Sequence, residues 1–562
     1  EVFPEMDLGD DNIYLYRKKF VSPTSSFGPT FYKYYILDTL KLDDGNKYID
    51  LGFAPAMPQS FGFVGHLYVS LDSTYWVKRA ELNMPPDINL NFVRNLHVEI
   101  ENARLADSTR VVARKSFDSE LNITSGSLGF YAHRVIRYSD FDDQRPADSE
   151  SIFNQSPVVE SQRFAQNSKN QDFWKYYRQS DDFDEEHSVE SMMARMRKVP
   201  FYKVTEMILS WLFKGFVPAD GKPDEQSKWM IGPINALASW NSLEHMRFRV
   251  GGITTANVHP RLFASGYVAY GIEDHKWKYD ASLEYSFRKR KLFANEFPMH
   301  SIKFESSYDT RELGLRLSTN RDNFVTSFRR SADPKFTYVR SNSLLYTLEF
   351  WNHFSLKLKA DMQREYISRL GRFDQVGSGI NMPHYDLALG TISLRWAPKE
   401  SFMQMRTTRV RVDKQHPVFE LTHQIAKKGF LGSDFDYQKT TFTFMKRFWM
   451  NVLGYADVDI EAGKVWTQSP YTLLSMPNAN TGYTIQKGAF SQLNSMEFVY
   501  DQYATWNVVW RLNGLLFNNL PLFRRLRLRE IISFRGVYGS LSDKNDPSLM
   551  KADGITPLNP DL

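Results

Sequence analysis

Residues able to carry out chemistry are common in this chain, but their spacing matches none of the familiar catalytic or metal-binding motifs. The 562 residues include 12 histidines and no cysteine. They contain no His-Glu-x-x-His zinc motif, no Gly-x-Ser-x-Gly nucleophile elbow, no phosphate-binding loop and no dinucleotide fingerprint. Four histidines stand alone in alternating segments: His300, His384, His416 and His423. We therefore predict no catalytic residue, no cofactor and no bound metal.

The charged residues that could act together are those that alternate with apolar ones. In residues 277–288 every odd position is apolar or aromatic and every even position is polar. Because successive side chains of a strand point to opposite faces, such a segment has one apolar and one charged face. The same pattern recurs in residues 302–309, 354–363 and 456–463.

The candidate site is this set of charged faces, which we expect to line the interior of a closed sheet. The acidic series of residues 457, 459 and 461 could meet the arginine series of residues 525, 527 and 529, which we expect on one face of a later strand. Arginine–carboxylate pairs between the two series would then stiffen the interior. The alternative is an ordinary polar wall with no special role. The residues expected to face the interior are Lys278, Asp280, Glu284, Arg288, Asp457, Asp459, Glu461, Arg525, Arg527 and Arg529.

The alternation fits either a membrane barrel or a soluble β-sandwich. Sandwich strands average about six residues, whereas the alternating segments here are roughly twice as long, and a tilted membrane strand needs about 9–11 residues. The aromatic content of 15% would supply the interfacial girdles of a membrane barrel. We predict a mainly β chain with a large antiparallel transmembrane β-barrel of about 16 strands over residues 228–562, its closing strands missing from this sequence.

Two further regions precede the expected barrel. Residues 1–125 contain short β-rich runs separated by turn residues, which predicts a small periplasmic β-rich domain. Residues 126–227 are acidic and weakly periodic, which indicates a linker of loops and helices, with one helix over 188–198. The net charge of +5 is small and scattered, so we expect no nucleic-acid partner.

Several segments resemble a family of uncharacterised Bacteroidota outer-membrane proteins. They are residues 34–42, 53–63, 82–93, 247–252, 257–262, 266–271, 277–279, 471–474, 497–503 and 521–530. Members of that family typically join a carboxypeptidase-regulatory-like domain to a large domain of unknown function. The family is more weakly similar to the BamA/TamA barrel-assembly superfamily. The Arg-Gly-Phe/Tyr loop motif of those assembly proteins is missing, since its nearest match, residues 534–537, falls in an expected strand.

The resemblance implies an outer-membrane location with the N-terminal part in the periplasm. The expected architecture, a periplasmic module joined by an acidic, helical linker to a barrel, favours a non-enzymatic barrel that acts in assembly, export or scaffolding of envelope proteins within a complex. Its partners would be outer-membrane lipid and other outer-membrane or periplasmic proteins. The first alternative is an outer-membrane solute channel. The second is a barrel hydrolase whose Asp/His or Ser/His site is assembled at a rim from residues distant in the sequence.

Overall fold

A computed structural model gives the architecture of the chain. The residues it describes are 6–15, 18–41, 45–57, 60–85, 88, 93–105, 109–121, 130–139, 141, 158–159, 215–222, 226–313, 336–368, 373–375, 382–405, 407–412, 414–450, 453–480, 482–483, 488–512, 514–526, 528–546, 549 and 555–556. Most of the predicted acidic linker, including the helix expected over 188–198, therefore lies outside the described residues.

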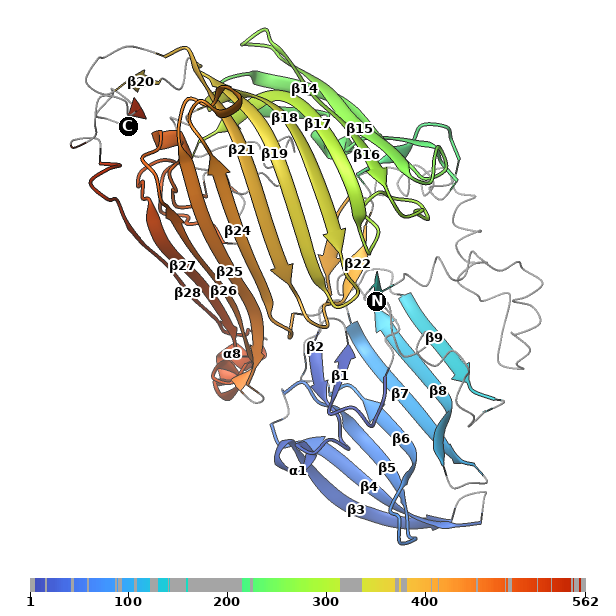
Figure 1. Ribbon diagram of the computed structural model, residues 1–562. Coiled ribbons are helices and arrows are strands. Elements are labelled where there is room, and N and C mark those ends of the chain that lie inside the picture. Colours follow the sequence, from blue (N-terminus) through green and yellow to red (C-terminus); the bar gives the residue numbers. More distant parts are fainter. Residues whose placement is uncertain are drawn as a thin grey trace. The chain divides into compact units, whose positions relative to one another are not determined.

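The described part of the chain is mainly antiparallel β-sheet, as predicted (Figure 1). Two compact units are distinguished: one contains Glu1–Gln155, Phe448–Ala456 and Val509–Ser533, and the other contains the remaining residues. The α-helices in the described residues are α1 (Gly28–Phe31) and α8 (Pro521–Arg525). Neither of these, nor any other helix within the ranges given above, is long and apolar enough to cross a membrane.

The N-terminal unit is built on a seven-stranded sheet in which every strand pairs with the next in sequence, in the order β3 to β9. It continues through residue 137, past the expected limit at 125. A separate hairpin of β1 (Asn12–Leu15) and β2 (Lys18–Val21) packs with it. The strands are β3 (Tyr32–Lys41), β4 (Lys47–Pro55), β5 (Val64–Ser70), β6 (Val77–Asn83), β7 (Val93–Arg104), β8 (Arg110–Leu121) and β9 (Phe130–Arg137).

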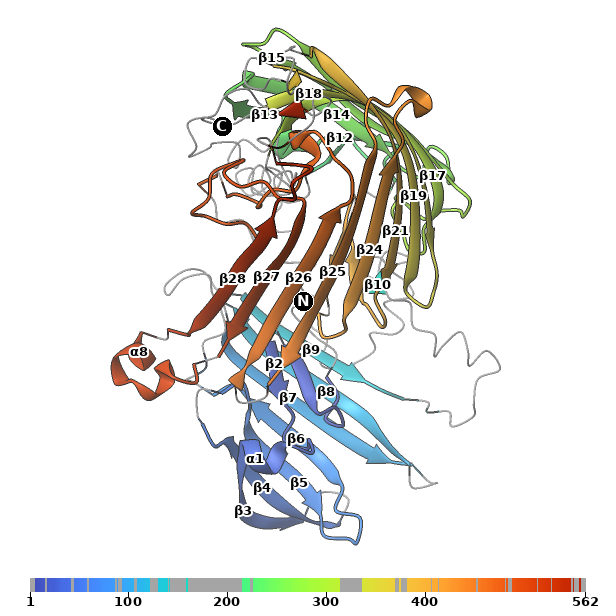
Figure 2. The same ribbon diagram turned by 60° about the vertical axis from the view of Figure 1, so that its left-hand side comes forward.

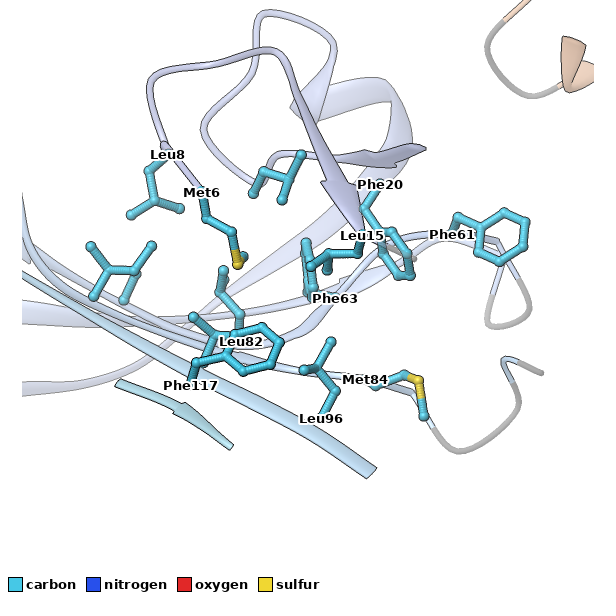
Figure 3. Close-up of a cluster of buried hydrophobic side chains, with 14 of the residues drawn as sticks. Met6, Leu8, Leu15, Phe20, Phe61, Phe63, Leu82, Met84, Leu96 and Phe117 are labelled. Atoms are coloured by element: carbon cyan, nitrogen blue, oxygen red, sulfur yellow. The ribbon is translucent and has the colours of Figure 1, made fainter. Parts of the chain in front are cut away.

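One face of this sheet carries a continuous hydrophobic core (Figure 3). Leu15 and Phe20 of the hairpin belong to one buried cluster with Phe63, Leu82 and residues of the neighbouring strands, and the rings of Phe20 and Phe63 stack at 4.9 Å. An isolated hairpin is marginal in water, so its burial against a sheet face stabilises both elements. The N-terminal unit thus has the ordinary polarity of a water-exposed domain, with an apolar interior.

Tyr32 connects the hairpin to the sheet through its hydroxyl group. The hydroxyl donates to the carbonyl of Val21 at 2.6 Å and accepts from the backbone N–H of Phe63 at 3.1 Å. The ring is 3% exposed, and burial raises the pKa of this phenol well above its usual value. Tyr32 therefore satisfies two backbone groups on separate segments, β2 and the start of β5.

Tyr32→Phe is expected to lower the free energy of unfolding of the N-terminal unit by about 1–3 kcal/mol, because it leaves two backbone groups without their partner. The matched control is Tyr34→Phe. Tyr34 is half-buried and makes one hydrogen bond, 2.6 Å to the carbonyl of Pro23, so its loss should cost less. Urea titrations followed by circular dichroism measure both changes. Equal costs for the two variants would contradict the role assigned to Tyr32.

The second sheet has 15 strands, in the order β11-β12-β14-β15-β16-β17-β18-β19-β21-β24-β25-β26-β27-β28, with β13 also paired to β14 (Figures 1 and 2). Its strands are β11 (Val217–Pro218), β12 (Trp229–Ile231), β13 (Ala238–Asn241), β14 (His245–Thr254), β15 (Leu262–Gly271), β16 (Trp277–Ser286), β17 (His300–Glu312), β18 (Phe336–Glu349), β19 (Phe354–Tyr366), β21 (His384–Trp396), β24 (Val418–Ala426), β25 (Tyr437–Trp449), β26 (Tyr455–Val465), β27 (Gln502–Arg511) and β28 (Ile531–Ser540).

Tight turns join several neighbouring strands of the large sheet. His275 between β15 and β16 has φ of 52°, and His353 between β18 and β19 has φ of 65°. Such left-handed residues let a short loop match the twist of the flanking strands.

The two ends of the large sheet are not joined to each other within the part of the chain that the structure describes. The strand order runs from β11 to β28 without a pairing that closes it. The mainly β, antiparallel architecture is thus confirmed, whereas the closed barrel and the number of about 16 strands stay predictions.

Candidate functional site

The large sheet has an inverted polarity: its polar side chains are covered and its apolar side chains are exposed. Strand β16 shows this most clearly. Trp277 is 67% exposed and Leu283 is 49% exposed, whereas Lys278, Ser282 and Ser286 are buried. A water-soluble domain normally buries the apolar face instead. We call the two sides of the large sheet its apolar face and its polar face.

The same polarity extends across neighbouring strands. On the apolar face, Leu344 of β18 lies opposite Phe304 of β17 and Ala360 of β19. Further large side chains that are exposed on this face are Val250, Val268, Tyr285, Leu358, Met362, Ile392, Leu394, Trp396, Leu421, Ile425 and Ile460. Scattered exposed apolar residues are common, but a contiguous apolar surface over many strands marks an interaction with apolar surroundings.

The best-buried charges of the polar face surround Lys278. Its Nζ lies 2.6 Å from Oε1 of Glu244 and 2.6 Å from Oδ2 of Asp274. The side chains of Lys278 and Glu244 are fully buried, and that of Asp274 is 5% exposed. Tyr338 donates to the same Oδ2 at 2.8 Å. One ammonium group thus holds two carboxylates that come from separate turns.

A second cluster lies beside the first and is centred on Asp309 of β17. Arg247 of β14 binds both carboxylate oxygens, at 2.6 and 3.0 Å, and Tyr267 of β15 donates to Oδ2. Arg247 also donates to Glu244 at 3.3 Å, which links the two clusters. The guanidinium of Arg249 lies 3.6 Å from the centre of the Tyr267 ring. The two clusters together connect five strands, β14 to β18, to the turns at one end of the sheet.

A third cluster is centred on Glu365 of β19, whose side chain is 2% exposed. Its carboxylate accepts from Tyr385 and Thr337 at 2.6 Å each and pairs with Arg311 at 3.2 Å. Tyr385 also contacts Thr472 at 2.6 Å, so the cluster extends to the segment between β26 and β27. Every oxygen of the central carboxylate has a donor, as the burial of a charge requires.

At the opposite end of the sheet, a small hairpin packs onto the polar face. Its strands are β22 (Phe402–Gln404) and β23 (Arg409–Arg411), and β22 also pairs in parallel with β10 (Val158–Val159). Arg409 of the hairpin binds Glu349 at 2.8 Å. Arg395 of β21 binds Glu400, which precedes the hairpin, at 2.6 Å. A cavity of about 570 Å³ lies between this hairpin and the sheet.

The structure places several of the predicted interior-facing residues on the polar face. Lys278 is the centre of the first cluster. Asp280 and Glu284 lie on the same side of β16, since they alternate with the exposed residues. Arg447 donates to both carboxylate oxygens of Asp457 in β26, from Nε at 2.6 Å and from Nη2 at 3.0 Å. Arg288 follows the end of β16 and is exposed.

The two other acidic residues of β26 have partners on the neighbouring strand β27. Asn507 donates to Asp459 at 3.2 Å, and Tyr503 donates to Glu461 at 2.5 Å. Arg535 of β28 donates in turn to Asn507 at 3.0 Å. The acidic series therefore meets β25 and β27, which are its immediate neighbours in the sheet.

The prediction that Arg525, Arg527 and Arg529 share one face of a strand is wrong. Arg525 ends helix α8, Arg529 precedes β28, and Arg527 lies outside the described residues. Pro521 explains the difference, because its fixed φ suits the first position of a helix and the leucine and arginine residues that follow are good helix formers. The arginine that pairs with Asp457 is instead Arg447.

The sequence pattern did not identify Glu244, Asp274, Asp309 and Glu365 as centres or members of clusters. Glu244 and Asp274 lie in turns, where no periodicity marks them, and Asp309 and Glu365 were indistinguishable from other alternating charges. Within the described residues no group of three or more His, Asp or Glu side chains is arranged to hold a metal ion. The chemistry that the clusters support is charge pairing. These ion pairs connect strands and turns across the polar face and thereby stabilise it.

The fold and its charged clusters define a class: a mainly antiparallel β protein whose large sheet is polar on the covered side and apolar on the exposed side. Family models identify the chain more closely. The C-terminal domain of a family of unknown function, DUF5686, matches residues 222–544, and the family's other model matches residues 5–139. The chain therefore belongs to this family of unknown function.

Other comparisons add little to that assignment. No curated protein matches the chain. Among solved structures the chain is similar to the crystal structure of BamA from Haemophilus ducreyi lacking POTRA domains 1-3, at 9% identity and a TM-score of 0.28. The match covers 49% of this chain and 52% of that one. The Bacteroidota origin and the carboxypeptidase-regulatory-like domain implied by the earlier resemblance stay expectations.

Proposed function

We propose that this protein is an outer-membrane β-barrel protein that acts without catalysis in the assembly, export or scaffolding of envelope proteins. The observation that carries this proposal is the inverted polarity of the 15-stranded sheet. An apolar face over successive strands is stable where lipid replaces water, and charged clusters are stable on a face that lipid does not reach. In this proposal the N-terminal sheet lies in the periplasm, where its apolar core and polar surface suit an aqueous compartment.

The dimensions of the apolar face support a membrane location. On β16 the exposed positions run from Trp277 to Tyr285, which corresponds to about 27 Å along a strand that rises ~3.4 Å per residue. A tilt of about 40° shortens this to ~20 Å, close to the apolar band of about 25 Å in known membrane barrels. Tryptophan and tyrosine at its two ends match the positions of interfacial aromatic residues.

The assembly role is supported by β28, the edge strand at one end of the large sheet. In the strand order of the described residues, β28 is the last member, and its Ile531, Ile532, Phe534 and Tyr538 are 47–69% exposed. Unpaired backbone groups of a strand are costly in lipid. A scaffold that pairs this edge with strands of its own or of another envelope protein would satisfy them. The expected partners are therefore outer-membrane lipid and other outer-membrane or periplasmic proteins.

Controlled depletion of the protein in its host tests this function. We expect the folded amount of other outer-membrane proteins, measured as heat-modifiable bands in isolated outer membranes, to fall at least severalfold. The tagged protein should also recover envelope proteins from detergent-solubilised outer membranes. Unchanged outer-membrane proteins together with steady conductance of the purified protein in planar bilayers would instead support the solute channel. Hydrolysis of lipid or peptide substrates, abolished by one Asp or His substitution, would support the hydrolase.

A further inference from the structure

The cavity between the β22–β23 hairpin and the polar face has an excess of positive charge. Six basic and four acidic side chains line it, which leaves two more positive than negative charges. The basic residues are Lys357, Arg395, Arg409, Arg411, Lys414 and Lys446. A hollow lined by one sign of charge within low-dielectric walls concentrates its electric field on whatever enters.

Pairing within the site accounts for most of the negative charge. Glu400 binds Arg395 at 2.6 Å and Glu349 binds Arg409 at 2.8 Å. Asp457 is neutralised by Arg447, which is not among the residues that line the cavity. These pairs account for three of the four carboxylates of the lining, and none of them includes Lys357.

Lys357 differs from the neighbouring lysine on the same strand in having no ion-pair partner among the described residues. It lies on β19, two residues from Lys359, and the two side chains point to the same face of the strand. Lys359 pairs with Asp361 at 2.8 Å. No carboxylate among the described residues forms an ion pair with Lys357, whose side chain is exposed to the cavity.

The remaining walls of the cavity are apolar. Met299, Leu345, Phe402 and Met445 line it together with the charged residues. A bare inorganic anion would leave these side chains in contact with water, whereas a ligand with an apolar body would cover them. A volume of about 570 Å³ is within the range of cavities that hold small organic ligands.

We propose that this cavity binds a phosphate-bearing organic anion with a small apolar body, and that Lys357 contacts the phosphate. Phosphate suits the site because lysine ammonium and arginine guanidinium groups both bind its oxygens strongly. The phosphate could belong to a lipid headgroup or to a soluble phosphate ester, which share this chemistry. The inference goes beyond the proposed function, since binding to purified protein requires no client or partner.

Isothermal titration of the whole protein in a zwitterionic detergent tests the site, with dihexanoyl phosphatidic acid and phenyl phosphate as the two probes. We expect at least one probe to bind, with Lys357→Gln weakening the affinity tenfold or more. Lys359→Gln is the matched control and should change the affinity less than twofold. Lys357→Arg keeps the charge and should retain binding, which covers the case in which Lys357→Gln does not fold.

The affinities of the two probes distinguish the two sources of the phosphate, and the affinities of the variants test the role of Lys357. Tighter binding of dihexanoyl phosphatidic acid identifies a lipid headgroup, and equal or tighter binding of phenyl phosphate identifies a soluble phosphate ester. The proposal is overturned if neither probe binds at millimolar concentration. It is also overturned if Lys357→Gln and Lys359→Gln weaken binding equally, because the effect would then be a general loss of positive charge. Neither result depends on whether depletion affects other envelope proteins.

Discussion

Lys278→Met is expected to lower the free energy of unfolding by about 3–5 kcal/mol. The substitution removes the one ammonium group that lies 2.6 Å from both Glu244 and Asp274, and it leaves two buried carboxylates facing each other. Breaking a buried ion pair from one side costs this much. The two carboxylates lose the ammonium group between them and keep only Arg247 at Glu244 and Tyr338 at Asp274 as donors. Urea titration in detergent, followed by the fluorescence of the 12 tryptophans, measures the change.

Two further variants separate the charge effect from the loss of packing. Lys276→Met alters an exposed lysine whose Nζ lies 3.8 Å from the centre of the Tyr338 ring, and it should cost less than about 1 kcal/mol. Lys278→Met combined with Asp274→Asn removes one of the stranded carboxylates and should recover part of the loss, since the amide oxygen can still accept from Tyr338. If the double variant is no more stable than Lys278→Met, charge repulsion is not the cause.

The alternation in the sequence was sufficient to predict the large sheet and, within its strands, the face on which a residue lies. A two-residue period fixes the facing of neighbours within a strand whatever the rest of the fold does. Lys278, Asp280 and Asp457 could therefore be assigned to the polar face directly. The seven-stranded N-terminal sheet was likewise expected as a β-rich domain, because its strands are separated by turn residues.

Partners of the charged residues could not be predicted in the same way. The pairing of Arg447 with Asp457 depends on the length of the turn between β25 and β26, which sets their register. Glu244 reaches Lys278 from a turn, and the strands between them have to be in place before the two meet. Arg525 was misplaced because a strand period was assigned to the residues that follow Pro521, although proline favours the start of a helix there.

The cavity could not be predicted from the sequence for a related reason. The hairpin strands β22 and β23 are three residues each, which is too short for a periodic signal. Lys357 and Lys359 look equivalent in sequence, and they differ only because Asp361 pairs with one of them. Residues that look alike in the sequence therefore differ in the fold. Lys359 forms an ion pair on the polar face, whereas Lys357 adds positive charge to the cavity.

Leu344→Arg tests the membrane location of the apolar face and is expected to lower the free energy of unfolding by about 2–4 kcal/mol in lipid vesicles. Leu344 lies near the middle of β18, is 46% exposed, and has Phe304 and Ala360 opposite it. An arginine there would have to place its charge in the hydrocarbon, where membrane barrels show costs of this size near the midplane. On a water-exposed sheet the same change would stay within about 0.5 kcal/mol.

The matched control is Gln363→Arg, which adds the same charge to the polar face of the adjacent strand. Gln363 donates to Asp361 at 2.6 Å and accepts from Arg311 at 3.3 Å. A guanidinium keeps the first hydrogen bond and loses the second, so we expect a cost of about 1 kcal/mol, well below that of Leu344→Arg. Urea unfolding of both variants in vesicles of one lipid composition gives the comparison. A large cost for Leu344→Arg alone means that lipid covers the apolar face. Equal small costs would mean that water covers it, and the inverted polarity would then have to be explained by a protein partner.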